Sequence, residues 1–95
     1  MRTIKRTSAF KKDFKKAYAT PRHTQDIDGL LLDALRLLVV DAPLPEHMRD
    51  HALVGDWKGY RECHIKPDLL LVYRPIDPDN KLELARIGSH SELFR

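Results

Sequence analysis

The sequence has little cysteine and no long apolar stretch. A single cysteine, Cys63, excludes an internal disulfide framework and fits a reducing compartment. Continuous apolar runs such as Leu37 to Val40 and Leu69 to Tyr73 are far too short to cross a bilayer, which takes about 20 residues. No apolar segment of the secretory type follows the first methionine. These absences predict a small soluble protein of the cytoplasm.

Repeats and low-complexity tracts are also absent, and what remains reads as one globular unit. With 95 residues, the chain is predicted to form a single domain over residues 1–95. An apolar share of 42% and a charged share of 33% are normal for a globular domain and exclude simple disorder.

Charge is segregated although the net charge is only +3. Residues 1–22 carry eight Lys or Arg and one acid, Asp13, whereas residues 23–50 carry six acids and two bases. A basic segment on a small domain suggests a polyanionic partner, most often nucleic acid. The alternative is a solvated helix face.

Helical periodicity predicts two helices in the first half of the chain. The first is expected to begin at Ser8 as N-cap and to end at Thr20-Pro21. The second is expected to begin near Thr24, with Asp26 and Asp28 in its first turn. The apolar faces that define the two helices are Phe10, Phe14, Ala17 and Tyr18, then Ile27, Leu30, Leu31, Ala34, Leu35 and Leu38.

The second half reads as strands. After a proline-broken loop at 41–50, strands are expected at 60–66, 69–73 and 81–87, joined by turns at 66–68 and 77–80. Residues 3–7 add a short edge strand, and a capping box at Ser89 to Glu92 starts a helical turn. The predicted fold is therefore α+β, with two N-terminal helices packed on a twisted antiparallel sheet of about four strands.

Histidine is the residue type that stands out for chemistry. His51, His64 and His90 fall near strand ends or turns, as do Asp68 and Arg86. Neither CxxC nor HxH spacing occurs, so a structural zinc site is not expected. Besides a metal site, these histidines could serve metal-free general acid–base catalysis. Alternatively, each is simply a surface or partly buried polar residue. His23 and His47 are assigned to the last group.

Aromatic and cationic residues alternate at Trp57, Lys58, Tyr60 and Arg61. Aromatic rings stack on unpaired bases while cations meet phosphates, so the pattern suits single-stranded RNA. Alternatively, the rings close one edge of the core. Strand alternation puts Cys63 and His64 on opposite faces and makes Cys63 a core residue. Phe94 either pins the tail to the sheet or offers a stacking platform beside the site.

Three motifs, DHAL, GDWKGYRECHIKPD and ARIGSHSELF, span most of the region between Asp50 and Phe94. They closely resemble the YafQ branch of the RelE/ParE superfamily of toxins. The resemblance implies a RelE-like fold and the toxin of a type II toxin–antitoxin module, an mRNA interferase that cuts messages in the ribosomal A site. It implies no metal or cofactor, a cognate antitoxin as partner, and operator DNA bound only by the toxin–antitoxin complex. The catalytic set that it implies is His51, His64, Asp68, Arg86, His90 and Phe94.

The expected reaction is attack of a ribose 2′-OH on the adjacent phosphate, leaving a 2′,3′-cyclic phosphate and a 5′-OH. Arg86 is assigned to charge stabilisation and His90 to the general acid. His64 with Asp68 is assigned to the base side, while His51 orients the phosphate or shares the acid–base work. The ribosome and RNA are expected to be bound by Lys11, Lys12, Lys15, Lys16, Trp57, Lys58 and Arg61.

Two other functions fit the sequence. One is a ParE-like toxin that acts by binding a topoisomerase, with the histidines incidental. The other is a catalytically silent module that binds RNA or the antitoxin.

Overall fold

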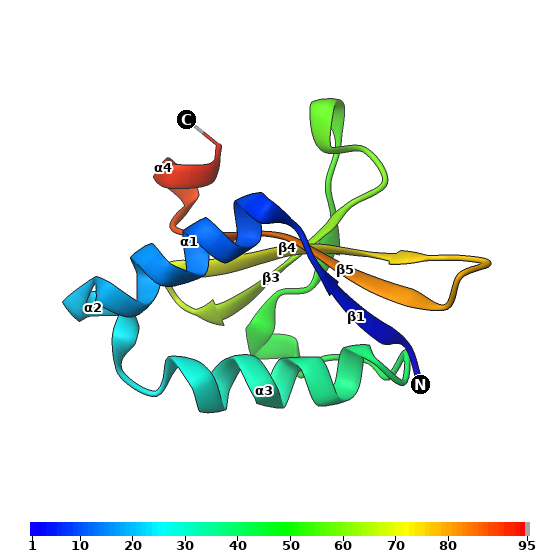
Figure 1. Cartoon of the computed structure of the whole chain (residues 1–95), viewed down its shortest axis with the longest axis horizontal. Coiled ribbons are helices and arrows are strands. Elements are labelled where there is room, and N and C mark those ends of the chain that lie inside the picture. The colour runs from blue at the N-terminus through cyan, green and yellow to red at the C-terminus, as the bar shows by residue number, and fades with distance from the viewer. Residues whose placement is uncertain (95) are drawn as a thin grey trace.

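The computed structural model describes residues 1–94, and in them a mixed sheet is covered by helices (Figure 1). The strands are β1 (Thr3–Arg6), β2 (His51–Ala52), β3 (Arg61–Lys66), β4 (Leu69–Ile76) and β5 (Lys81–Gly88). The α-helices are α1 (Ser8–Ala19), α2 (Pro21–Thr24), α3 (Ile27–Leu38) and α4 (His90–Leu93), and the 3₁₀ turns are η1 (Glu46–Met48) and η2 (Gly55–Trp57).

The sheet has the strand order β1-β5-β4-β3-β2. The predicted meander is confirmed, because β3, β4 and β5 pair antiparallel and the apolar β4 lies at the centre. The prediction of about four antiparallel strands needs correction: β1 pairs parallel with β5, and the two-residue β2 adds a fifth strand beside β3. A parallel pair needs a long crossover, which the helices supply here.

The N-terminal helices differ from the prediction at their ends. Thr7, not Ser8, caps α1, since its hydroxyl accepts the Phe10 N–H at 2.9 Å. The helix does end at Thr20, but Pro21 then starts the short helix α2, where proline fits the first position. As a result α3 begins at Ile27, three residues later than expected, after Asp26 in a left-handed conformation.

The larger core lies between one face of the sheet and the helices α1 and α3. The predicted apolar faces supply it, with the exception of Tyr18, which is 52% exposed at the end of α1. Cys63 is fully buried in this core, as expected, and burial raises the pKa of its thiol to about 12. The strand residues of this core include Cys63, Ile65, Leu69, Leu71, Tyr73, Leu82, Leu84 and Ile87.

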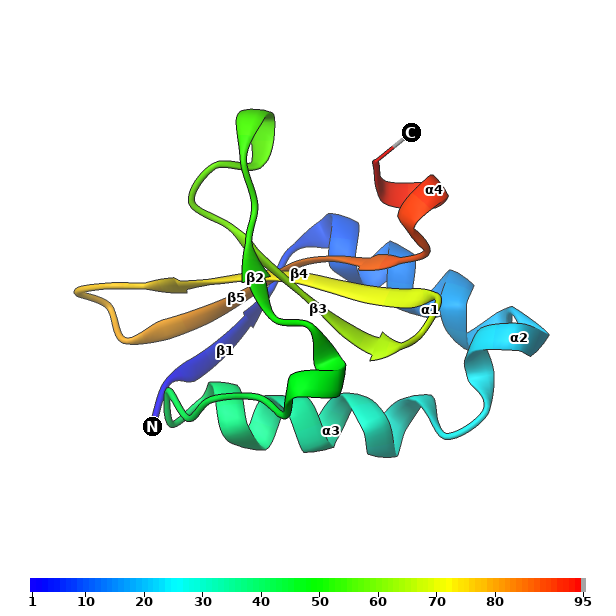
Figure 2. The ribbon, with the colours of Figure 1, turned by 180° about the vertical axis from the view of Figure 1, so that it is seen from behind.

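The opposite face carries a smaller core around Leu70, Val72, Ala85 and Leu93. It is covered by α4 and by the loop 53–60, which project from the same side of the sheet (Figures 1 and 2). No α-helix among residues 1–94 is long and apolar enough to span a membrane. The loop and α4 leave a hollow between them, and that hollow positions the site described next.

Candidate active site

Strand register places three of the polar residues in one row across the sheet. His51 pairs with Glu62, Glu62 with Val72, and Val72 with Arg86. Directly paired residues of antiparallel strands point to the same face, here the face of the smaller core that holds Val72. His64 shares that face because it is two residues from Glu62 along β3.

Glu62 lies between two of the predicted catalytic histidines. Its carboxylate is 3.5 Å from His51 Nε2 and 3.9 Å from His64 Nε2. The side chain is 7% exposed, so water screens its charge poorly. Sequence reasoning missed Glu62, although the alternation expected for 60–66 already puts it on the face of His64.

The orientation of the His51 ring is set by the backbone. Its Nδ1 lies 2.7 Å from the Arg49 carbonyl oxygen, which can only accept, so Nδ1 carries a proton and donates. Nε2 is therefore the nitrogen that gains or loses a proton, and it is the one that faces Glu62. A histidine held in this way can act as a general base or acid.

A hollow of about 260 Å³ joins the row to the loop and to α4. His51, Glu62 and His90 supply polar groups, and the apolar wall is formed by Leu53, Val54, Trp57 and Phe94. Phe94 is half-buried against Trp57 and His90, with ring centroids 6.0 and 5.3 Å apart. The hollow thus combines proton-transfer groups with aromatic surface, which suits a nucleotide.

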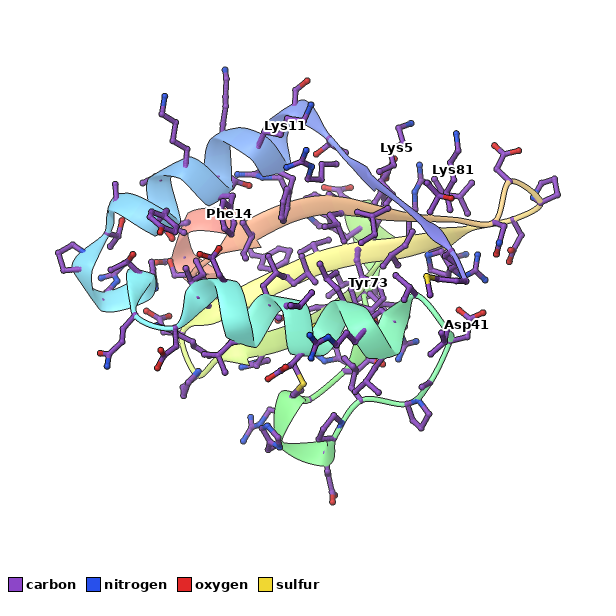
Figure 3. All side chains as sticks on the ribbon, turned by 60° about the horizontal axis from the view of Figure 1, so that its bottom comes forward. Lys5, Lys11, Phe14, Asp41, Tyr73 and Lys81 are labelled. Carbon is purple, nitrogen blue, oxygen red and sulfur yellow. The ribbon has the colours of Figure 1, made fainter. Side chains whose placement is uncertain are left out.

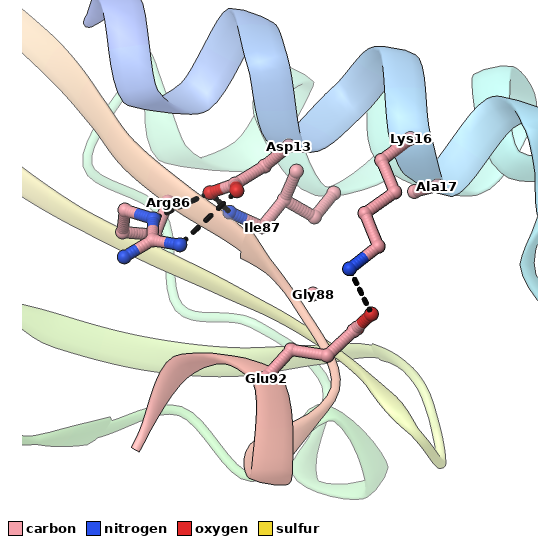
Figure 4. A pocket seen from close by; sticks show the side chains of 7 residues that line it. All are labelled: Asp13, Lys16, Ala17, Arg86, Ile87, Gly88 and Glu92. Carbon is pink, nitrogen blue, oxygen red and sulfur yellow. Dashed lines mark hydrogen bonds and ion pairs between the residues drawn. The ribbon is translucent and has the colours of Figure 1, made fainter. Parts of the chain in front are cut away.

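The predicted capping box holds α4 in place. The Ser89 hydroxyl accepts the Glu92 N–H at 3.2 Å, and the Glu92 carboxylate accepts the Ser89 N–H at 2.8 Å. Glu92 also pairs with Lys16 Nζ at 3.2 Å, which ties α4 to α1 (Figure 4). Ser89 N–H and hydroxyl contacts, with help from Lys16, lower the pKa of Glu92 to about 2.

Arg86 forms an ion pair with a carboxylate from α1. Asp13 accepts from Arg86 Nε at 2.5 Å and from Nη2 at 3.1 Å, and it also accepts the Ile87 N–H (Figure 4). The hydrogen bonds to Asp13 raise the pKa of Arg86, so its positive charge is permanent. The remaining nitrogen, Nη1, makes no bond to Asp13 and can meet an anion. Sequence reasoning also missed Asp13, the one acid of the basic segment.

Asp68 lies apart from the row. It is largely exposed in the β3–β4 turn, 3.9 Å from Arg22 Nε, and it lines a different hollow with His23 and Lys66. The structure therefore brings Glu62, rather than Asp68, into contact with His64.

The predicted RNA-binding residues occupy several surfaces. Lys11, Lys12, Lys15 and Lys16 are exposed on α1 (Figure 3 labels Lys11), and Lys58 is exposed in the loop 53–60. Trp57 packs at 5.2 Å from Tyr60 as part of the smaller core. Arg61 turns to the opposite face of the sheet. There the Asp50 carboxylate accepts hydrogen bonds from the Arg61 guanidinium and from the Tyr73 hydroxyl.

Metal-binding side chains do not gather in the described part of the chain. Among residues 1–94 no group of three His, Cys, Asp or Glu side chains could hold a metal ion. His47 and His51 are four residues apart, but they lie outside any α-helix and line different hollows.

Known proteins match the chain along almost its whole length. The family model of YafQ, the bacterial toxin of a type II toxin–antitoxin system, matches residues 2–95. The mRNA interferase toxin YafQ of Escherichia coli K12 is 38% identical over 93 residues, which cover 98% of this chain and 96% of that protein.

Solved structures share the fold. A metal-bound toxin from Helicobacter pylori has a TM-score of 0.87 and 44% identity, over 99% of this chain and 100% of that one. YafQ in the DinJ–YafQ complex of Escherichia coli has a TM-score of 0.82 and 36% identity, over 100% of both chains.

Proposed function

Because the chain belongs to the YafQ family of bacterial toxins of type II toxin–antitoxin systems, we propose that it cleaves messenger RNA on the ribosome by general acid–base catalysis without a metal ion. Membership of this family confirms the resemblance seen in the sequence. The chain is an endoribonuclease of the mRNA interferase class, as the name of its Escherichia coli relative states for that protein.

The observation that carries the proposal is the arrangement of His51, Glu62 and His90 around one hollow, with Arg86 in the same row of the sheet. Such a set contains the three parts that cleavage of RNA by its own 2′-OH requires. These are a base for the 2′ proton, a cation for the phosphorane and an acid for the leaving 5′ oxygen.

His51 is the base that the geometry favours, in place of the pair His64 and Asp68 that the sequence suggests. Its Nε2 lies beside Glu62, both residues line the hollow with His90, and Glu62 stabilises the imidazolium that forms when Nε2 takes the 2′ proton. His64 contacts the same carboxylate from the other side and keeps Glu62 in place. Asp68 remains a predicted catalytic residue, but it makes no contact with the row formed by His51, Glu62 and Arg86.

His90 acts as the acid and Arg86 holds the charge. His90 is exposed at the start of α4, next to Phe94, so its ring is free to reach a leaving oxygen. Arg86 keeps Nη1 for the phosphorane while Asp13 fixes its plane. Each proton-transfer group contributes about 10²–10⁴-fold to the rate.

The partners follow from the same family. A cognate antitoxin binds and silences the toxin in this proposal, which the DinJ–YafQ complex of the Escherichia coli relative supports. Operator DNA is then bound only by the toxin–antitoxin complex of this chain. The exposed lysines of α1 face outward and are suited to ribosomal RNA.

Primer extension on a translated message tests this function. We expect new ends only when both the protein and translation are present, with a 2′,3′-cyclic phosphate on one product and a 5′-OH on the other. Intact messages together with inhibition of a topoisomerase would instead establish the ParE-like alternative.

A further inference from the structure

A larger hollow, of about 460 Å³, opens beside the candidate active site along the edge of β3. Strand β2 pairs only with Arg61 and Glu62, so the outer edge of β3 beyond them faces the turn η1. His64 connects this groove to the active site, since it lines the groove and contacts Glu62. The lining residues are His47, Arg49, His64, Ile65, Lys66 and Pro67.

Positive charge in the groove is not compensated. None of the lining residues is acidic. Most arginines of the chain are held by a carboxylate, but within residues 1–94 Arg49 has no carboxylate at ion-pair distance. Lys66 Nζ donates only to the neutral backbone carbonyl of His23, at 2.9 Å. The groove therefore presents two uncompensated cations, and His47 adds a third group that can be protonated.

Arg49 links the groove to the catalytic residues. Its backbone is left-handed, with a φ of 50°, a conformation that arginine rarely adopts. In this conformation its carbonyl accepts the His51 Nδ1–H while its side chain lines the groove. One residue thus orients the His51 ring through its backbone and contributes a cation to the groove.

We propose that this groove, through His47, Arg49, His64 and Lys66, binds the phosphodiester backbone of the message next to the scissile phosphate. The inference rests on the proposed nuclease function and names the path of its substrate. Arginine and lysine are the side chains best suited to phosphate oxygens. Phosphate contacts position a strand without reading its sequence, so the groove supplies affinity and register rather than codon preference.

The test measures binding rather than cleavage. The probe is a short single-stranded RNA with methylated 2′-hydroxyls, which the enzyme cannot cut. The groove variant is Arg49→Gln with Lys66→Gln, and Arg49→Gln alone serves if removing the Lys66 hydrogen bond to α2 disturbs folding. The matched control is Arg6→Gln with Lys81→Gln, which removes the same charge from β1 and β5 (Figure 3 labels Lys81).

Salt dependence is the readout. Each phosphate that the protein no longer neutralises lowers the slope of log affinity against log salt by about 0.7, so the slope of the double groove variant should be smaller by about 1.4. The change should be the same for RNAs of different sequence, while the control keeps the slope of the unmodified protein.

Equal slopes in the groove variant and the control would overturn the proposal. The proposal would also be overturned if the groove variant kept its salt slope for the probe but had a smaller slope for binding to ribosomes without message. The phosphates that the groove contacts would then belong to ribosomal RNA. The nuclease function fails separately: a protein that binds the probe through the groove but leaves translated messages uncut supports the groove and contradicts the cleavage.

Discussion

In the proposed mechanism, cleavage depends most directly on His90. Its ring is exposed, with its centroid 5.3 Å from that of the Phe94 ring, so removing it leaves no cavity in either core. We expect His90→Ala to keep the fold and the antitoxin complex while cleavage falls about 10²–10⁴-fold in primer extension. Cleavage at the rate of the unmodified protein would show that His90 transfers no proton.

Glu62 provides a second test at this scale. Glu62→Gln keeps the shape of the side chain but removes the charge that is proposed to stabilise the His51 imidazolium, so cleavage should fall at least tenfold, at about 1.4 kcal/mol per factor of ten. The matched control is Glu83→Gln, a carboxylate buried to 5% exposure that pairs with Arg74 away from the hollow. If both variants lose cleavage equally, the effect of Glu62 is one of stability.

The residues that the sequence predicted and those it missed differ in the range of their contacts. His51, Arg86 and His90 stand in motifs that can be read locally. Asp13 gains its role from the packing of α1 on β5, which no local pattern displays. Alternation puts Glu62 on the face of His64, but only the pairing of β2 with β3 places His51 beside it. His47 shows the same limit, because its groove forms only when η1 meets β3.

Among the elements, α4 depends on one carboxylate. The folded pKa of Glu92, about 2, lies below its ordinary value of 4.5. The stability that Glu92 adds is therefore complete above about pH 4.5 and is lost as the pH falls towards 2. Fluorescence of Trp57, which packs on Phe94, should report the release of α4 in this range. In Glu92→Gln this acid transition should disappear, and its persistence there would contradict the assignment.

The outward face of α1 gives a further prediction. Lys11→Glu, Lys12→Glu and Lys15→Glu together leave the Lys16 contact to Glu92 intact. We expect this variant to bind ribosomes more weakly and with a smaller salt slope, because fewer counterions are released. Sedimentation with ribosomes over a range of salt measures the effect, and circular dichroism checks the fold. An unchanged salt slope would show that these lysines do not bind ribosomal RNA and that they form either a solvated helix face or a binding surface for the antitoxin.

Element boundaries are harder to predict than the elements themselves. The strands of the meander are predictable because apolar alternation and two turn signals mark them. The start of α3 is not, since a proline that ends one helix here also begins another, and the pattern around Thr24 fits both helix and linker.

At the scale of the whole molecule, the α+β class is predictable from the sequence and the parallel edge is not. A four-residue strand carries no signal for the strand that it joins, and the partner of β1 lies at the other end of the sequence. The site is likewise a property of the assembled sheet, with contributions from β2, β3, β5 and α4.

Chelation tests the chemistry of the whole enzyme. We expect EDTA to leave cleavage of a translated message unchanged once the magnesium that ribosomes need is restored, because the proposed steps use only side chains. Activity that EDTA abolishes and that zinc, rather than magnesium, restores would refute the metal-free mechanism. The comparison is informative because a Helicobacter pylori relative has been solved as a metal-bound toxin.

The pairing of β1 with β5 also matters during translation. Protein synthesis makes β1 first, yet the residues that pair with it, beginning with Lys81 opposite Thr3, are made only after every other strand. Arg86 arrives on that same last strand. A nascent chain therefore has no complete sheet until β5 has emerged, and the candidate active site, which includes Arg86 on β5 and His90 after it, is assembled only then.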